Sequence, residues 1–303
     1  MDRVSKMIRR QCLLAFLSAL VVVVCVCAGV TMNLTTVYDE NFDHMGIRTF
    51  CMFTVNSNIL TGAAMSMVIP YTLDGLRKHN YHMPRWIVTL VYAAVTAVTL
   101  TFLISLCVLA PFKGFRLIFS GSRFFLHGVC PILAFLAFCF FMSEQRLCRT
   151  DMLLAFTPVL LYSAVYYVMV VVIGENRGGW NDFYGFATRV PIWASACLIL
   201  VSTFCIIVLV RFLHNGSYRR RREAAADYYR RTFAGADVRE IVSAMGRARG
   251  SSVKMRDVVV PTRLFAILLE NSGSDCSLEE CCELFIREYL AASAPMDTKK
   301  LWI

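Results

Sequence analysis

Charged residues are scarce in this chain. Only 17% of its 303 residues are Asp, Glu, Lys or Arg, whereas 57% are hydrophobic. Soluble globular domains carry about 25% charged residues and less than about 50% apolar ones. The shortage of charge therefore argues against an ordinary soluble enzyme, although neither length nor composition indicates an activity.

Charge is absent altogether from six long apolar runs. The runs cover residues 11–32, 50–71, 86–110, 124–142, 152–174 and 190–210. Each is long enough, as a helix, to cross a hydrocarbon core about 30 Å thick, and none shows the two-residue alternation of a membrane barrel. The sequence therefore predicts an all-α, polytopic membrane protein. A six-transmembrane-helix bundle would occupy residues 1–213, and a small helical cytoplasmic tail would occupy residues 214–303.

Lys and Arg are distributed unevenly between the two sides of these runs. A cytoplasmic N-terminus places most of the flanking basic residues inside, namely Arg3, Lys6, Arg9, Arg10, Arg77, Lys78, Arg85, Arg146, Arg149, Arg211, Arg219, Arg220, Arg221 and Arg222. The basic loop between the third and fourth runs is the exception. The positive-inside rule predicts a multi-pass protein of the cell membrane with both termini in the cytoplasm.

The first run has a second interpretation. Arg9 and Arg10 precede an apolar stretch that ends in Val26, Cys27 and Ala28, a sequence typical of a signal-peptide cleavage site. Because the run is long for a signal core, we expect a retained span. Cleavage would leave five spans and the same tail.

Pairs of cysteines with CxxC spacing are absent, although the chain has 13 cysteines. The sequence thus gives no support for a metal site, and we expect no cofactor. The net charge of +10 is carried largely by residues that flank the runs, and no nucleic-acid-binding module accompanies it. We expect membrane lipids as partners, a cytoplasmic protein as a candidate partner of the tail, and no nucleic acid.

The tail contains helix signals separated by loop residues. Residues 218–233 are predicted to continue the sixth run as a helix. Pro261 indicates the start of a short apolar helix that ends at Leu269, and Ser277 with Glu280 forms a capping box before another helix. Gly and Ser at 250–252 indicate a loop.

Neutral polar residues within the runs are few, and each costs free energy unless it finds a partner. The second run has the densest set, in which Thr54, Asn58 and Thr61 share one helical face, with Asn56 close by. The fourth run carries His127, the only imidazole within any run. Thr54 and His127 are predicted to lie at matched depths, roughly 4 to 6 Å below the outer boundary.

A hydroxyl and an imidazole at one depth are the groups that a Thr nucleophile and a His base require. The amide of Asn56 or Asn58 offers a donor to an oxyanion. The alternative is structural, because Thr commonly bonds to the preceding turn, Asn bridges helices, and a boundary His binds a carbonyl. The residues alone leave both interpretations open.

Aromatic residues gather near the same predicted boundary. Tyr162 and Tyr166 share a face of the fifth run, and Trp180 and Tyr184 flank Asp182 in the outer loop. They are candidates for binding a lipid carbonyl or carboxylate. The alternative is that they anchor the helices at the interface.

Prolines lie inside the fourth and fifth runs, at Pro131 and Pro158. Each removes a hydrogen bond to the carbonyl four residues earlier, which for Pro131 is that of His127. We predict a kink at both prolines, and the kink beside His127 is a candidate opening for a polar pocket. Irregular packing without a functional role is the alternative.

Four strings combine these features in one order around the six runs: FTVNSN (53–58), VLAP (108–111), LHGVCPIL (126–133) and WNDFYGF (180–186). Together they resemble a bacterial six-span membrane family noted for its prolines, which is distantly similar to the eukaryotic androgen-induced-gene type proteins. The resemblance covers residues 7–211. It implies a six-helix bundle and, for the eukaryotic branch, intramembrane hydrolysis of fatty acid esters of hydroxy fatty acids by a Thr and a His. Those roles would fall on Thr54 and His127.

Overall fold

The computed structural model of the chain describes residues 3–35, 46–78, 83–186, 191–233, 252–255 and 258–261. Within these ranges, six helical stretches are long and apolar enough to cross a membrane: Arg9–Thr35, Phe53–Arg77, Arg85–Lys113, Gly121–Phe141, Arg149–Ile173 and Ile192–Arg221. Each coincides with one predicted run. The prediction of a six-helix, all-α bundle is therefore confirmed, and the chain is a multi-pass membrane protein.

Three spans are single α-helices: α1 (Arg3–Thr35), α2 (Phe53–Lys78) and α10 (Ile192–Phe233). The third span consists of α3 (Arg85–Ile104), the π-helical turn η2 (Ser105–Leu109) and α4 (Ala110–Lys113). The fourth consists of α6 (Gly121–Arg123), η3 (Phe124–Val129, π), α7 (Cys130–Leu136) and η4 (Ala137–Phe141, π). The fifth consists of α8 (Arg149–Ala155), α9 (Thr157–Tyr167) and η5 (Val168–Ile173, π).

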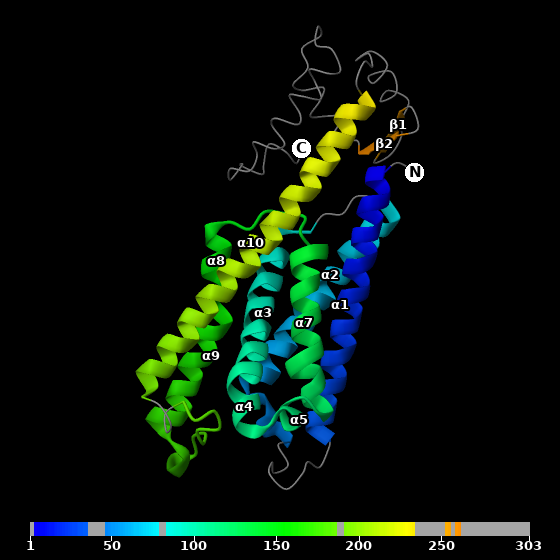
Figure 1. Cartoon of the computed structure of the whole chain (residues 1–303). Helices are drawn as coiled ribbons and strands as arrows, with labels where there is room; N and C mark the ends of the chain where they lie inside the picture. Colours follow the sequence, from blue (N-terminus) through cyan, green and yellow to red (C-terminus); the bar gives the residue numbers. More distant parts are fainter. Residues whose placement is uncertain are drawn as a thin grey trace.

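Short helices lie between the spans: η1 (Gly46–Cys51), α5 (Phe115–Ile118) and η6 (Glu175–Arg177). α1 begins and α10 leaves the bundle at the same end, which we call the tail end (Figure 1). α2 and η3 begin at the opposite end, which we call the loop end. Because the direction of each span is known, every loop can be assigned to the tail end or to the loop end.

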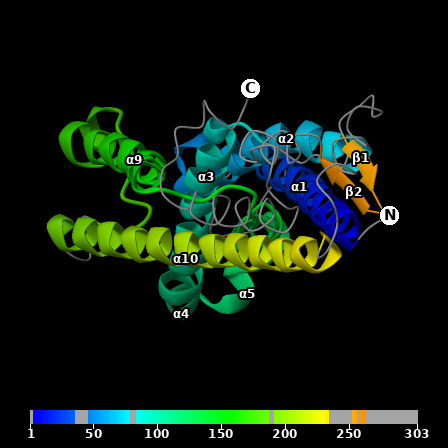
Figure 2. The ribbon, with the colours of Figure 1, turned by 90° about the horizontal axis from the view of Figure 1, so that it is seen from above.

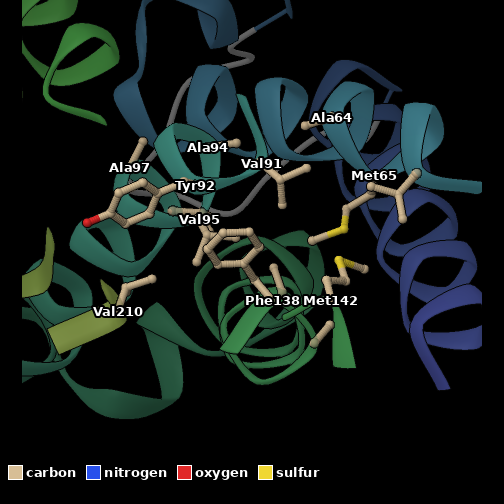
Figure 3. Packing of buried hydrophobic residues seen from close by; sticks show 14 of the residues in the cluster. Ala64, Met65, Val91, Tyr92, Ala94, Val95, Ala97, Phe138, Met142 and Val210 are labelled. Carbon is tan, nitrogen blue, oxygen red and sulfur yellow. The ribbon is translucent and has the colours of Figure 1, made fainter. Parts of the chain in front are cut away.

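α3 lies in the middle of the bundle, with α1 and α2 on one side and α9 on the other (Figure 2). The apolar stretch of the third span is 61% buried, whereas that of the fifth is only 11% buried. Figure 3 shows Tyr92 of α3 and Phe138 of η4 within the core, where their stacked rings are 5.9 Å apart. The Tyr92 hydroxyl donates to the carbonyl of Ile207 at 2.6 Å, which ties α3 to α10.

Both prolines for which a kink is predicted lie beside a change in their helix. The fifth span is interrupted at Phe156, two residues before Pro158, and the π-helical turn η3 ends just before Pro131. The register just before Pro131 is wider than that of the α-helix on which the predicted acceptor is based. The N–H of Cys130 bonds to the carbonyl of Phe125, five residues back, so in this wider register the carbonyl opposite Pro131 is that of Leu126.

The described part of the tail is a helix followed by a hairpin. α10 continues to Phe233, as predicted. β1 (Ser252–Met255) then pairs antiparallel with β2 (Val258–Pro261), where the sequence indicated a loop and a helix start. Three consecutive β-branched valines favour the extended conformation there. The remaining predicted helical residues, 262–269 and those after Ser277, lie outside the described residues.

Candidate functional site

Thr54 lies in the first turn of α2, at the loop end. Its carbonyl accepts hydrogen bonds from the Ser57 hydroxyl at 3.1 Å and from Asn58 Nδ2 at 2.7 Å. Its side chain lies beside the phenol of Tyr184, which accepts the N–H of Phe53 at 3.0 Å. Thr54 is half-buried, so its hydroxyl lies at the edge of the helix packing.

His127 lies in the π-helical turn η3 and is only 8% exposed. Its Nδ1 is 3.1 Å from the carbonyl oxygen of Ile118, and its ring meets that of Phe119 edge-on. Because a carbonyl can only accept, Nδ1 carries the proton, and in the neutral ring Nε2 keeps its lone pair. Among the described residues, no hydrogen bond joins Thr54 to His127.

Asn58 connects the two turns that carry these residues. Its Nδ2 donates to the carbonyl of Thr54 at 2.7 Å and to the carbonyl of Leu126 at 2.9 Å. The second acceptor is the carbonyl that Pro131 leaves without its helical donor. Asn58 is fully buried, and its Oδ1 has no partner among the described residues. The first turn of α2 and the turn of His127 therefore face each other.

The other polar residues of α2 also bond to their surroundings. Asn56 Nδ2 donates to the carbonyl of Phe50 at 2.8 Å, and the hydroxyls of Ser57 and Thr101 are 2.9 Å apart. Thr61 is fully buried and donates toward the carbonyl of Ala94 on α3. Since Asn58 uses both amide hydrogens and Asn56 only one, Asn56 is the amide with a hydrogen left for an oxyanion.

The four predicted aromatic residues converge at the loop end. The Tyr162 hydroxyl donates to the carbonyl of Cys51 at 2.7 Å, and the Tyr166 hydroxyl donates to Asp182 Oδ1 at 2.5 Å. The ring of Tyr162 lies 6.0 Å from that of Tyr166 and 6.5 Å from that of Trp180. Tyr184 completes the group, and burial raises the pKa of its phenol. The segment after η5 is thereby attached to the start of α2.

A polar network at the tail end is not apparent from the sequence alone. Asp151 in the first turn of α8 accepts the N–H of Cys148 at 2.6 Å and the Thr89 hydroxyl at 2.8 Å, and it pairs with Arg85. Thr89 and Arg85 both belong to α3 and thus join it to α8. The spacing of Cys148 and Asp151 is that of a capping box, and this signal is visible in the sequence.

His214 and Asn215 extend this network to α10. The ring nitrogens of the fully buried His214 lie 3.0 Å from the carbonyl of Phe138 and 2.9 Å from that of Gln145. Asn215 accepts the N–H of Leu147 at 2.8 Å and donates to its carbonyl at 3.1 Å. α10 therefore runs through the predicted boundary at residue 213 without a break. His214 follows the buried Val210 at helical spacing, which is the signal that points to its burial.

The described residues contain no group of three or more His, Cys, Asp or Glu side chains that could hold a metal ion. No protein-family model, curated protein or solved structure matches the chain. The family resemblance and the roles that it implies for Thr54 and His127 therefore stay predictions. The geometry around Asn58 is the feature of this site that bears on function.

Proposed function

We propose that the protein is an intramembrane hydrolase of lipid esters, with Thr54 as nucleophile and His127 as base. The observation that carries the proposal is the position of Asn58, whose amide bonds to carbonyls in the turns of both residues. Independent support comes from the His127 ring, whose Nδ1 bond to Ile118 keeps Nε2 available as the basic nitrogen.

In the proposed reaction, His127 Nε2 takes the proton of the Thr54 hydroxyl as its oxygen attacks the ester carbonyl. The alkoxy group leaves with that proton, and water then hydrolyses the acyl-threonine ester with His127 again as base. The free amide hydrogen of Asn56 is the candidate oxyanion donor. No hydrogen bond between Thr54 and His127 is found among the described residues, so substrate binding must bring the Thr54 hydroxyl and His127 Nε2 within reach before the reaction starts.

We further propose that the protein resides in the cell membrane with both termini in the cytoplasm, which places Thr54 and His127 near the outer surface. The excess of Lys and Arg that flanks the spans at the tail end supports this orientation. Lipids of the outer leaflet would then be the accessible substrates and partners.

The test is labelling of the purified full chain with a fluorophosphonate probe, which reacts with activated hydroxyl nucleophiles. We expect labelling of the wild type and its loss in Thr54→Ala and His127→Ala. Matched controls are Ser66→Ala, an exposed hydroxyl on the same helix, and His214→Gln, an imidazole at the other end of the bundle. Labelling that survives both substitutions, or that never appears, would contradict the hydrolase proposal.

A second candidate function is a membrane scaffold that presents its tail to a cytoplasmic protein. It is favoured by α10, a single helix of 42 residues and thus about 63 Å long, which exceeds the thickness of the hydrocarbon core. His214 and Asn215 hold its exit point against the bundle. A scaffold needs neither Thr54 nor His127, so the labelling experiment distinguishes the two functions.

A further inference from the structure

Two thiols meet inside the bundle, between α1 and α7. The side chains of Cys25 and Cys130 interact with each other across this interface. Cys130 is fully buried, Cys25 is half-buried, and both are reduced.

Helix packing fixes the position of the pair. A Cβ atom at Gly29 of α1 would lie only 2.7 Å from a side-chain methyl of Leu126, so the Leu126 side chain packs directly against the backbone of α1 at that point. Cys25 precedes Gly29 by four residues, about one α-helical turn, and Cys130 follows Leu126 by four residues, slightly less than one turn of the wider π-helical register. Because the two spans run in opposite directions, Cys25 and Cys130 lie opposite each other one turn deeper.

We propose that Cys25 and Cys130 form a dithiol oxidation site, which a lipid-soluble two-electron oxidant of the quinone class converts to a disulfide. Each thiol loses one electron and one proton as the sulfur–sulfur bond forms. The quinone takes up both electrons and both protons and becomes the hydroquinone. An apolar oxidant reaches the pair through the half-exposed Cys25, while Cys130 is shielded from water-soluble reagents.

The disulfide would tie α1 to α7 one turn away from Leu126, whose carbonyl Asn58 holds. Oxidation would therefore attach the fourth span, in which η3 holds His127, to α1. This inference concerns the thiols alone and does not depend on the proposed hydrolase activity.

The experiment treats membranes that contain the full chain with decylubiquinone, alkylates the remaining thiols and maps the peptides by mass spectrometry. We expect a peptide that joins Cys25 to Cys130 and loss of alkylation at both. Cys25→Ser and Cys130→Ser should abolish the crosslink, whereas Cys27→Ser, on the exposed face of the same helix, should retain it. Alkylation of both thiols after oxidation, or a crosslink to another cysteine, would overturn the proposal.

A second measurement uses the wild type only and so does not depend on the folding of a variant. Phenylarsine oxide bridges two neighbouring thiols through its arsenic atom and releases one water. We expect a single arsenic bridge that protects Cys25 and Cys130 together from alkylation. Protection of only one of the two, or of neither, would show that the thiols are too far apart to form the site.

Discussion

Tyr184 shows how one side chain at the loop end depends on distant parts of the chain. Its phenol accepts the Phe53 N–H at 3.0 Å, although 131 positions of the sequence separate the two residues. The sequence identified Tyr184 as a candidate because an aromatic residue near a boundary is informative. Its hydrogen-bond partner could be identified only from the fold, because that partner lies at the start of α2, far from Tyr184 in the sequence.

Replacement of Tyr184 by Phe should change the pH dependence of stability. Burial raises the pKa of the folded-state phenol above its ordinary value of about 10, so its contribution is fully present below pH 10 and is lost as pH rises toward the folded-state pKa. Tyr184→Phe should lower the melting temperature at pH 8 but reduce the further loss between pH 8 and about pH 11. Thermal unfolding in detergent measures both. If the melting temperature fell equally with rising pH in the wild type and in Tyr184→Phe, the raised pKa of Tyr184 would be contradicted.

The π-helical turns show how an element changes what a residue can do. In η3 the wide register moves the unpaired carbonyl from His127 to Leu126, and Asn58 of α2 donates to it. The sequence predicted an irregularity at Pro131 because proline lacks an N–H. The sequence could not predict the hydrogen-bond register of this turn. Whether a turn is α-helical or π-helical depends on how the adjacent helices pack against it.

Pro131 and Asn58 should therefore be energetically coupled. Asn58→Leu alone removes the side-chain donor to the carbonyl of Leu126 and one of the donors to that of Thr54, and it should lower the free energy of unfolding by about 1–3 kcal/mol. Pro131→Ala restores an N–H opposite Leu126, so the same substitution should cost less in that background, with a coupling on the order of 1 kcal/mol. A double-mutant cycle of thermal unfolding measures it. Pro158→Ala is the control that should not couple, and additive effects of Asn58→Leu and Pro131→Ala would disprove the pairing.

The whole molecule is held together differently at its two ends. At the loop end, the aromatic residues fix one segment to the start of α2. At the tail end, side chains of α3, α8 and α10 bond to the segment 143–148 and to its flanks. α10 leaves the bundle from this second network, so the position of the tail depends on it.

Asn215→Ala should loosen that connection. The substitution removes the two bonds between its amide and the backbone of Leu147, and a loss of about 1–3 kcal/mol in stability is expected. Hydrogen exchange at residues 143–148 should become faster, while exchange in α2 should not change. Ser217→Ala, two residues later on the same helix, is the matched control. Unchanged exchange in Asn215→Ala would show that α10 is held by apolar packing alone.

The sequence by itself determined the number, position and helical nature of the spans, because a bilayer excludes charge and demands internally bonded backbone. It also identified Thr54, His127 and the aromatic residues, because polar groups are rare within such spans. Only the tertiary structure decided their partners. Asn58 bonds to Leu126 of another span, the backbone of Phe53 bonds to Tyr184 of the loop after the fifth span, and Cys25 interacts with Cys130 of another span. Hydropathy and spacing describe one helix at a time, whereas these bonds depend on which helices are neighbours and on how closely they approach.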